Sequence, residues 1–294
     1  MSVLVVCGRG PGWSDVMLYR ACRRAFRSAR LVRACDLSAS VDDRGVRFWH
    51  GGVELERPDV CFIRSLGPGT HEQLAARMAV LRAMEESGVL TINSVSALWS
   101  AKDKFSSLLA LREAGFSIPT TYLTESSSAA YHLCEHMEKL VYKPLMGSLG
   151  FGSMLFEDRD LAFNIFSLLE RHGCPLYVQA FLGDVRRELR ALAIADELVA
   201  CVEKKALSGA WKRNVAQGGQ MIMTEAPPGL EELCLRALRK LGLFYAGIDV
   251  LEMGNGRLVA LEANASPNWR GLQKATGLDI AELLVERALE ELRK

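Results

Sequence analysis

The sequence predicts a mixed α/β and α+β protein, in which a doubly wound parallel-sheet domain is followed by a unit with antiparallel strands. Two observations predict this organisation. Strand-like and helix-like segments alternate over the first third of the 294 residues, which is typical of a parallel sheet. Between residues 176 and 205, three strand-like segments follow one another without a helix, which is typical of antiparallel pairing.

In the first domain, short apolar runs predict strands and the spacing of apolar residues between them predicts helices. Helical spacing covers 15–29 and 70–87, and Gly88 directly follows the second helix. The predicted strands are 3–7, 31–35, 59–64 and 89–92.

The second unit mixes helices and strands less regularly. A helix over 102–114 is ended by Gly115, and a second helix begins at the serines 126–128 and runs to about 137. Further helices are expected at 161–171, 230–241 and 280–293. The expected strands are 120–123, 140–144, 152–157, 176–182, 187–195, 197–205, 245–252 and 257–264.

Composition and charge narrow the classes of function. The chain is 49% hydrophobic and 24% charged with a formal net charge of +1, so it predicts a globular protein without nucleic-acid partners. No apolar run is long enough to span a bilayer, and the amino terminus has neither a basic leader nor a cleavage site. We therefore expect a cytoplasmic protein without a membrane partner. The eight cysteines form no C-x-x-C pair, which favours reduced, buried thiols.

Three oxygen-bearing side chains near the carboxyl terminus predict a metal site. Asp249 lies within an apolar strand-like segment, whereas Glu262 and Asn264 share one face of the next strand. A glycine-containing turn at 254–256 folds these strands into a hairpin and brings the three side chains together. Such a set suits Mg²⁺ or Mn²⁺, and we expect two ions. The alternative is that these are satisfied polar residues at strand ends.

Two segments are candidates for phosphate contacts. Glycines at 147, 150 and 152 follow Lys143 and can present backbone amides to phosphate, although the loop is not a Walker A motif. Cations at 204, 205, 212 and 213, with Arg190 before them, can neutralise charge during phosphoryl transfer. The alternatives are an ordinary hairpin loop and a solvated charged strand.

Two other motifs carry less weight. The segment GRGPG at 8–12 follows a strand as a dinucleotide-binding turn does, but Trp13 stands where that motif needs its third glycine. His132 and His136 are four residues apart, yet they lack the glutamate of a zincin helix, which favours surface histidines.

Taken in order, these segments resemble the ATP-grasp superfamily, and within it the RimK-like α-L-glutamate ligases, over essentially the whole chain. The most specific stretches are AKDKF at 101–105, WKRNVAQGG at 211–219, GIDVLE at 247–252 and LEANASPNWRGLQKATG at 261–277. The resemblance implies a pre-ATP-grasp domain over 1–96, a lid subdomain over 97–180 and a carboxy-terminal subdomain with the metal site over 181–294.

The resemblance also implies roles for individual residues. Arg190 and Lys212 would be catalytic, and the segment 178–182 would be the hinge whose backbone holds the adenine. Ala180 stands where the family commonly has an acidic residue. Lys212 stands where arginine is frequent, so the bidentate phosphate contact of an arginine would be replaced by the single charge of a lysine. The implied ATP contacts are Lys104, Lys143, Gly147, Ser148, Gly150, Gln179, Phe181, Leu182, Glu188, Lys212 and Asn214.

The implied reaction has two steps. ATP phosphorylates an acceptor carboxylate, and the amine of an incoming amino acid, expected to be L-glutamate, attacks the acyl phosphate to give an amide, ADP and phosphate. No side-chain nucleophile is required, and the sequence shows no Ser/His/Asp or Cys/His set. Catalysis would rest on positioning and on charge neutralisation.

The acceptor is expected to lie between two segments. Arg64 ends a strand of the first domain, where open α/β sheets place ligands, with a surface ion pair as the alternative. Asn268, Trp269 and Arg270 follow the metal strand and can supply a stacking face and a carboxylate clamp.

The segments RSLG, INS and WRGLQ resemble tetrahydromethanopterin-type α-L-glutamate ligases most closely. That resemblance implies a pterin or deazaflavin coenzyme as the small-molecule acceptor. A RimK- or LysX-like ligase acting on a ribosomal-protein tail or an amino-group carrier protein is the alternative, and a non-catalytic ATP-binding interaction module is another. The sequence is compatible with a homo-oligomer.

Overall fold

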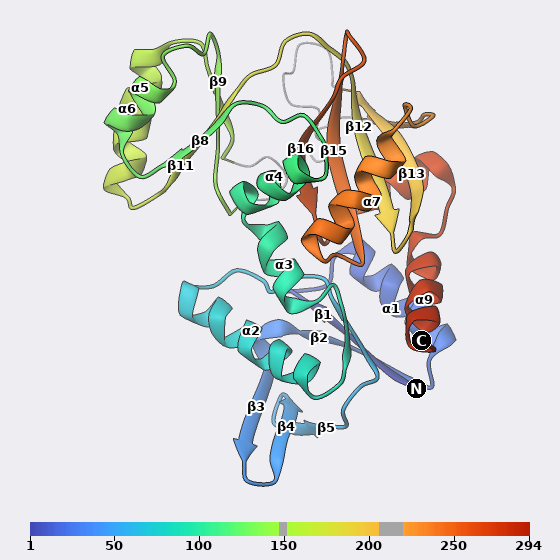
Figure 1. The fold of residues 1–294 in the computed structure, drawn as a ribbon. Helices are drawn as coiled ribbons and strands as arrows, with labels where there is room; N and C mark the ends of the chain where they lie inside the picture. Colours follow the sequence, from blue (N-terminus) through green and yellow to red (C-terminus); the bar gives the residue numbers. More distant parts are fainter. Residues whose placement is uncertain (147–151, 206–219) are drawn as a thin grey trace.

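The computed structural model describes residues 1–146, 152–205 and 220–294. The described strands form four sheets, which are spread along an elongated molecule. In Figure 1 the amino-terminal sheet lies in the lower half, a five-stranded sheet lies above it, and a second four-stranded sheet forms the lobe at the upper left. No helix among the described residues is long and apolar enough to cross a membrane.

The amino-terminal sheet is parallel and has the order β2-β1-β6-β7, so the four predicted strands and their parallel pairing are confirmed. Alternate residues of β1 pack into different hydrophobic clusters: Leu4 and Val6 face the side of α2, whereas Val3 and Val5 face the side of α1 and α9. Helices therefore cover both faces, as a doubly wound sheet requires. The elements are β1 (Ser2–Cys7), α1 (Trp13–Ala25), β2 (Ser28–Arg33), β6 (Val60–Ile63), α2 (His71–Glu86), β7 (Leu90–Ile92) and α9 (Ile280–Glu291).

The sequence analysis missed an antiparallel three-stranded sheet between β2 and β6. It consists of β3 (Leu37–Asp42), β4 (Gly45–His50) and β5 (Val53–Leu55), preceded by the short 3₁₀ helix η1 (Ala34–Asp36), and it projects from the lower end of the molecule (Figure 1). Phe48 and Leu55 are buried at its base, but most of its other residues are exposed. The apolar alternation that reveals a half-buried strand is therefore too sparse in this segment.

The helix predicted over 102–114 is α4 (Lys104–Glu113), and the sequence analysis missed α3 (Val95–Lys102), which directly precedes it. Asp103 separates them because its backbone is extended and its carboxylate accepts a hydrogen bond from the Phe105 backbone N–H at 2.9 Å. This cap begins α4 at Lys104.

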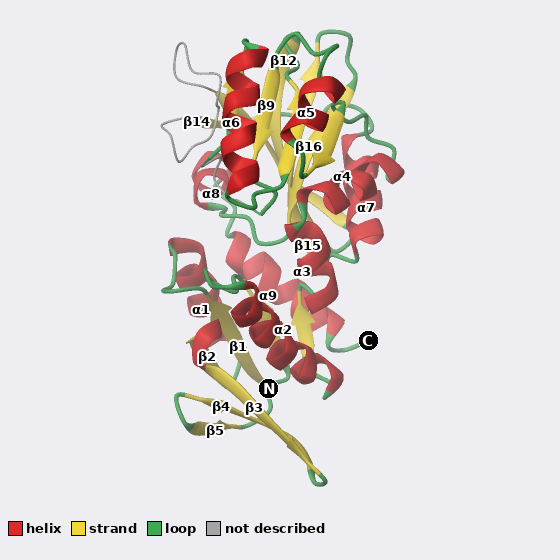
Figure 2. Ribbon diagram, turned by 90° about the vertical axis from the view of Figure 1, so that its left-hand side faces the viewer, coloured by secondary structure: helices red, strands yellow, loops and turns green. Residues whose placement is uncertain are grey.

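The second four-stranded sheet is antiparallel with the order β10-β9-β11-β8. Its inner residues pack under α5 and α6, which cover one face of the sheet (Figure 2). The helix predicted to reach about 137 ends at Leu133, the last residue of α5. The elements are β8 (Thr121–Thr124), α5 (Ser127–Leu133), β9 (Leu140–Lys143), β10 (Met154–Phe156), α6 (Arg159–Arg171) and β11 (Leu176–Ala180).

The five-stranded sheet is antiparallel with the order β14-β13-β12-β15-β16. Leu189 and Ala191 of β12 point toward α7 and belong to the largest hydrophobic cluster, whereas Glu188 and Arg190 lie on the opposite face. The sequence analysis missed β14 and α8. The elements are β12 (Val185–Ile194), β13 (Glu197–Lys205), β14 (Gln220–Met223), α7 (Leu230–Leu241), β15 (Tyr245–Met253), β16 (Leu258–Asn264) and α8 (Arg270–Thr276).

A buried asparagine joins the parallel sheet to the five-stranded sheet. Asn93 follows β7 and is fully buried, and its side-chain amide donates to the carbonyls of Tyr245, at 2.9 Å, and Ala265, at 2.7 Å. Its Oδ1 accepts from the backbone N–H groups of Phe244 and Tyr245. Because these partners flank β15 and β16, Asn93 fixes the amino-terminal domain against the end of the predicted metal hairpin.

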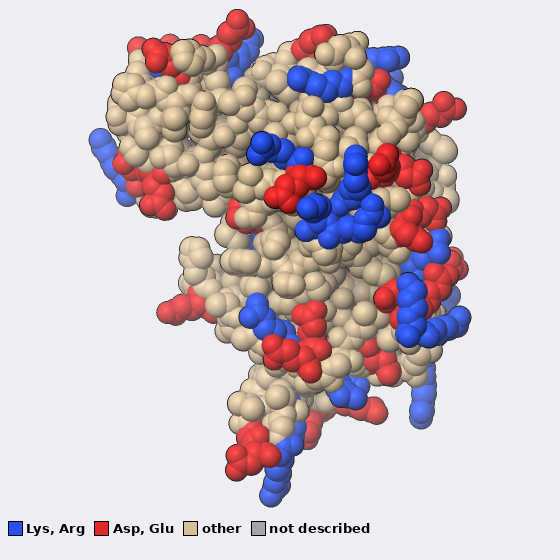
Figure 3. Space-filling model, in the orientation of Figure 1, with Lys and Arg blue, Asp and Glu red and all other residues tan. Residues whose placement is uncertain are grey.

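The surface facing the viewer in Figure 3 carries both signs of charge, with its largest group of cations over α7. Two cations of α7 have acidic partners: Arg236 lies 3.5 Å from Glu232, and Lys240 lies 3.3 Å from Glu113. Exposed pairs of this kind add little stability.

Candidate functional site

One face of the five-stranded sheet brings three predicted metal ligands and Arg190 together. Arg190 of β12 lies opposite Asp249 of β15, and Asp249 lies opposite Glu262 of β16. Gly247 is the cross-strand neighbour of Asn264 in the same hairpin. Directly opposed residues of antiparallel strands project from the same face. The carboxylates and the amide that the sequence singled out therefore share a face with a cation.

Asp249 is buried and held between two cations. Its Oδ1 lies 2.6 Å from Arg190 Nε and 2.7 Å from Lys204 Nζ, and Arg190 Nη2 donates to Oδ2 at 2.8 Å. Burial by itself raises the pKa of Asp249, but the positive charges of Arg190 and Lys204 outweigh it and hold that pKa below its usual value. The carboxylate is therefore ionised inside the protein.

Lys204 is a site residue to which the sequence analysis gave no individual role. Its side chain is only 2% exposed, and its Nζ lies 3.2 Å from Glu188 Oε1 in addition to its contact with Asp249. The ammonium group thus links the predicted nucleotide contact to the predicted metal ligand. One signal was present in the sequence: Lys204 has the same parity along β13 as the buried Val202, so it occupies an inward position.

Gly247 explains the first residue of the GIDVLE motif. A Cβ atom at this position would lie 2.8 Å from Arg190 Nη1 and 2.9 Å from Pro267 Cβ. The absence of a side chain therefore lets the guanidinium of Arg190 lie across β15 and reach Asp249 two residues further on.

Two lysines approach this face from other elements. Lys143 ends β9, and Lys104 begins α4, with its Nζ 3.5 Å from the Leu145 carbonyl. Burial lowers the pKa of both lysines; the charge of Glu262 raises both values, and Lys104 lowers that of Lys143 further. This mutual influence places the two lysines and Glu262 in one electrostatic cluster. Thus β9 and α4 each supply a cation to the acidic row, which is the pair of carboxylates Asp249 and Glu262 on the five-stranded sheet.

Hydrogen bonds to neighbouring strands and loops fix the residues of the predicted hinge. Gln179 is buried, and its side-chain amide donates to Thr121 Oγ1 and to the Tyr177 hydroxyl, both at 2.9 Å. The Phe181 backbone N–H donates to the Lys139 carbonyl, and Leu182 packs against the small cluster around Leu251. The Gln179 side chain therefore positions the hinge, whereas Leu182 lines the side toward β15.

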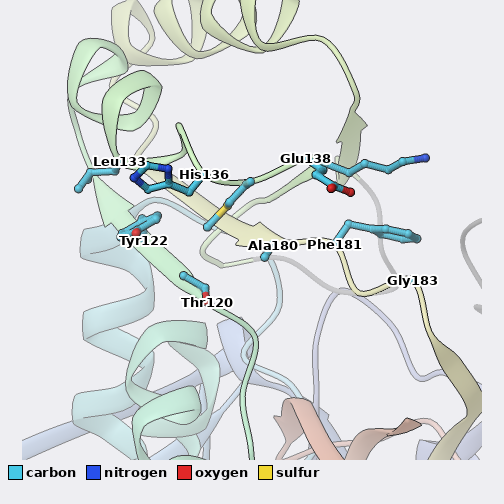
Figure 4. A pocket seen from close by; sticks show the side chains of 10 residues that line it. Thr120, Tyr122, Leu133, His136, Glu138, Ala180, Phe181 and Gly183 are labelled. Atoms are coloured by element: carbon cyan, nitrogen blue, oxygen red, sulfur yellow. The ribbon is translucent and has the colours of Figure 1, made fainter. Parts of the chain in front are cut away.

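A cavity of about 530 Å³ lies beside this hinge on the helix-covered side of the second sheet (Figure 4). Tyr122, His136 and Met137 line it together with Ala180 and Phe181. Because Ala180 packs with the cluster under α5 and α6, this cavity is on the face away from Lys143 and the acidic row. One predicted nucleotide contact, Phe181, lines it, whereas Lys143 lies on the opposite face.

Arg64 does not face the acidic row. It is buried, with Nε 3.1 Å from Asp15 Oδ1, while Nη1 donates to the Tyr245 hydroxyl at 2.6 Å and Nη2 to the Pro267 carbonyl at 2.8 Å. Its guanidinium also lies 4.3 Å from the centre of the Trp269 ring. These contacts join the amino-terminal domain to the loop after β16. Arg64 is therefore neither a free cation that could hold an acidic acceptor nor part of a surface ion pair.

The three residues after Pro267 differ in exposure. Trp269 is buried against Arg64, so its ring offers no open stacking face. Asn268 is exposed and its Oδ1 accepts from the Ser14 hydroxyl at 3.0 Å. Arg270 is exposed, and its guanidinium lies 5.8 Å from the centre of the Trp13 ring. Arg270 is thus the cation of this loop that an acidic ligand can reach.

Five predicted nucleotide or catalytic residues lie outside the described residues: Gly147, Ser148, Gly150, Lys212 and Asn214.

The donor set fits a hard divalent cation. Two carboxylates and one amide oxygen share the face, and Asp249 Oδ1 is buried beside its cations without a directed hydrogen bond. Asn264 Oδ1 accepts one hydrogen bond, from the Ser266 N–H at 2.9 Å, and a carbonyl oxygen has a second lone pair. Among the described residues, no group of three or more His, Cys, Asp or Glu is placed so that it could hold a metal ion by itself, and in this set the third oxygen belongs to an asparagine.

Comparison with known proteins identifies the family to which this chain is similar. Residues 101–288 match the model of the RimK-like ATP-grasp domain. A tetrahydromethanopterin:alpha-L-glutamate ligase of Methanocaldococcus jannaschii is 32% identical over 246 residues, which cover 81% of this chain and 82% of the relative. A ribosomal protein bS6–L-glutamate ligase of Escherichia coli is 31% identical over 210 residues, which cover 70% of each chain.

A solved structure has the same fold over nearly its whole length. The ATP-grasp ligase PsnB, complexed with a minimal precursor, superposes with a TM-score of 0.78 at 21% identity and covers 98% of each chain. The fold expected from the sequence is therefore confirmed. This chain belongs to the RimK-like ATP-grasp family and is a ligase of its glutamate-ligase branch.

Proposed function

We propose that this ligase uses magnesium-ATP to phosphorylate an acceptor carboxylate and joins it to L-glutamate, and that the acceptor is a pterin or deazaflavin coenzyme. The observation that carries the proposal is the acidic row of Asp249 and Glu262, which is flanked by Arg190 on the neighbouring strand and approached by Lys143 from the second sheet.

In this proposal Asp249, Glu262 and Asn264 hold two Mg²⁺ or Mn²⁺ ions. Bound metal would neutralise charge on the phosphates of ATP. Lys104 and Lys143 would contact those phosphates, since both are partly buried cations whose pKa responds to the charge of Glu262. Glu188 would lie near the ribose, and the backbone of Phe181 and Leu182 would hold the adenine. The proposed domains remain 1–96, 97–180 and 181–294.

The proposed chemistry requires the acceptor carboxylate and the amine of glutamate to lie close to the γ-phosphate of ATP. An oxygen of the acceptor carboxylate attacks the γ-phosphorus, the bond from that phosphorus to the β-phosphate oxygen breaks, and ADP leaves. The amine of glutamate then attacks the acyl carbon, phosphate leaves with the electron pair of the C–O bond, and the nitrogen loses a proton. Arg190 and Lys212 would stabilise the negative charge that develops.

Two observations favour a small coenzyme as acceptor. The pterin-ligase relative aligns with 81% of the chain, against 70% for the relative acting on a ribosomal protein. Arg270 is an exposed cation beside Trp13 at the junction of the amino-terminal domain and the metal hairpin. An arginine next to an aromatic ring can take a carboxylate and an adjoining planar group. Arg64 would position this junction rather than bind the acceptor.

A protein tail is the second candidate acceptor. The relative that acts on ribosomal protein bS6 supports it, as it is 31% identical to this chain. We also propose a cytoplasmic location, because ATP is the proposed substrate and all eight cysteines are free.

The test is a panel of acceptors incubated with the purified protein, ATP, Mg²⁺ and glutamate, followed by ADP measurement and product mass. We expect ADP release that needs both acceptor and glutamate, with a pterin or deazaflavin product heavier by one glutamyl unit. A product formed only with a ribosomal-protein tail would overturn the coenzyme proposal. ATP binding without acceptor-dependent ADP release would instead identify an interaction module, and a product with another amino acid would overturn the glutamate assignment.

A further inference from the structure

Lys204 stands out because it is a buried cation in direct contact with a metal-ligand carboxylate. Its side chain is 2% exposed, and its Nζ lies 2.7 Å from Asp249 Oδ1. The neighbouring Lys205 is exposed and has no such contact among the described residues. A lysine this deeply buried is uncommon unless its charge is paired, and here Glu188 and Asp249 pair it.

The charges around the proposed metal site are already balanced within the described residues. Four carboxylates belong to this cluster, from Asp103, Glu188, Asp249 and Glu262. They are accompanied by an equal number of cations, namely Lys104, Lys143, Arg190 and Lys204. The described part of the cluster therefore has no excess of negative charge to attract a divalent ion that arrives by itself.

We propose that Lys204 is a positioning residue that makes metal binding depend on nucleotide: together with Arg190 it balances Asp249 in the free protein and so prevents Mg²⁺ from occupying the site alone. The inference rests on the proposed metal site. A nucleotide triphosphate or diphosphate brings several negative charges to Lys143 and Lys104, and this gives the cluster a net negative charge. The electrostatic potential at the proposed metal site therefore favours a divalent ion only when the nucleotide is bound.

The geometry explains why Lys204 rather than Lys104 or Lys143 has this role. Lys204 contacts Asp249 Oδ1, the buried oxygen that has no directed hydrogen bond, and it also contacts Glu188, a proposed ribose neighbour. It is therefore the cation that joins a proposed metal ligand on β15 to a proposed nucleotide contact on β12 of the same sheet. Its charge opposes the ion at close range, where screening by salt is weakest.

The experiment measures Mn²⁺ binding from the free Mn²⁺ signal in electron paramagnetic resonance, with and without ADP. Four proteins are compared: the wild type, Lys204→Met, the charge-retaining Lys204→Arg and the exposed control Lys205→Met. We expect the wild type to bind Mn²⁺ weakly alone and tightly with ADP. Lys204→Met should bind Mn²⁺ without ADP at least about tenfold more tightly, whereas Lys204→Arg and Lys205→Met should behave like the wild type.

Measuring Mn²⁺ affinity both with and without ADP distinguishes a positioning role of Lys204 from a merely structural role. A structural role predicts that Lys204→Met lowers the unfolding temperature and weakens Mn²⁺ binding equally with and without ADP, and this result would overturn the inference. An unchanged nucleotide-free affinity would overturn it as well. If Lys204→Met does not fold, Lys204→Gln, whose amide can still donate to both carboxylates, is measured in the same way. If the wild type binds no Mn²⁺ even with ADP, the proposed metal site itself is wrong.

Discussion

The guanidinium of Arg190 lies 2.6 Å from the carboxylate of Asp249, directly across from it on the neighbouring strand. Gly247 leaves the space that this contact needs. A proposed catalytic cation and a proposed metal ligand are therefore one structural unit, and substitutions in the two residues will not have additive effects.

Replacing Arg190 by alanine should lower turnover by about 10²–10³-fold, the scale of losing one preorganised donor to a developing anion. The matched control is Arg186→Ala, because Arg186 is mostly exposed and pairs with Glu252 instead. Steady-state ADP formation compares the two variants. Near-normal turnover of Arg190→Ala would remove this residue from the mechanism.

Two buried acids of β15 should respond differently to neutralisation. Asp249→Asn should raise the Mn²⁺ concentration needed for activity, because it removes a charged ligand from the acidic row. Glu252 is also buried but is paired with Arg186 and Arg187, so Glu252→Gln should lower the unfolding temperature and leave the metal dependence unchanged. Equal metal dependence in both variants would contradict the assignment of Asp249.

The pH dependence of stability should reveal the strain on Lys143. Burial, followed by the charge of Lys104, lowers the pKa of Lys143 in the folded protein, whereas the unfolded value is about 10.4. Below the folded pKa both states are protonated and the folded state bears the full cost of the buried charge. As the pH rises through the folded pKa, the folded state loses its proton first and this cost disappears.

Lys143→Met should therefore stabilise the nucleotide-free protein most at neutral pH, with an advantage that shrinks as the pH rises. The measurement is the difference in unfolding temperature between the variant and the wild type across this range. An advantage that grows with pH would contradict the direction of the shift.

Arg64→Ala should act on stability more than on acceptor affinity. Its removal leaves Asp15, the Tyr245 hydroxyl and the Pro267 carbonyl without their common partner, which should cost about 3–5 kcal/mol. Arg64→Lys should restore little, because one ammonium cannot replace a guanidinium with three partners and a stacked ring. Chemical denaturation measures the loss. A variant with wild-type stability and a raised acceptor KM would instead make Arg64 a direct acceptor contact.

The cysteines should react in an order set by burial. Burial raises the pKa of Cys22 and that of Cys61 to about 12, so their thiolates are scarce at neutral pH. Cys35 is exposed and Cys174 is partly exposed. A thiol reagent should therefore modify Cys35 and Cys174 in the native protein, and the other cysteines only after unfolding. Rapid modification of Cys61 in native protein would contradict the packing of β6.

The strands of the parallel sheet, and the hairpin of β15 and β16, could be predicted because they bury apolar runs. Asp249 could be recognised as a site residue because a carboxylate inside an apolar run needs a partner. The meander of β3, β4 and β5 could not, because it buries little beyond its base.

The roles of Lys204, Arg64 and Trp269 depend on tertiary placement. Lys204 acquires its role only when the register of β13, β12 and β15 places it between Glu188 and Asp249. Trp269 follows the metal strand as predicted, but Arg64, 205 residues away in sequence, covers its ring. A polar or aromatic residue near a site is visible in a sequence, whereas the partner that it contacts is set by packing.

Transfer of oxygen from the acceptor to phosphate tests the proposed chemistry most directly. The protein is incubated with ATP, Mg²⁺, glutamate and an acceptor whose carboxylate carries heavy oxygen, and the released phosphate is analysed by mass spectrometry. Acyl-phosphate formation predicts one heavy oxygen in each phosphate released with product, because the acceptor oxygen that attacks phosphorus leaves with it. Product formation with unlabelled phosphate would contradict carboxylate activation at the acidic row.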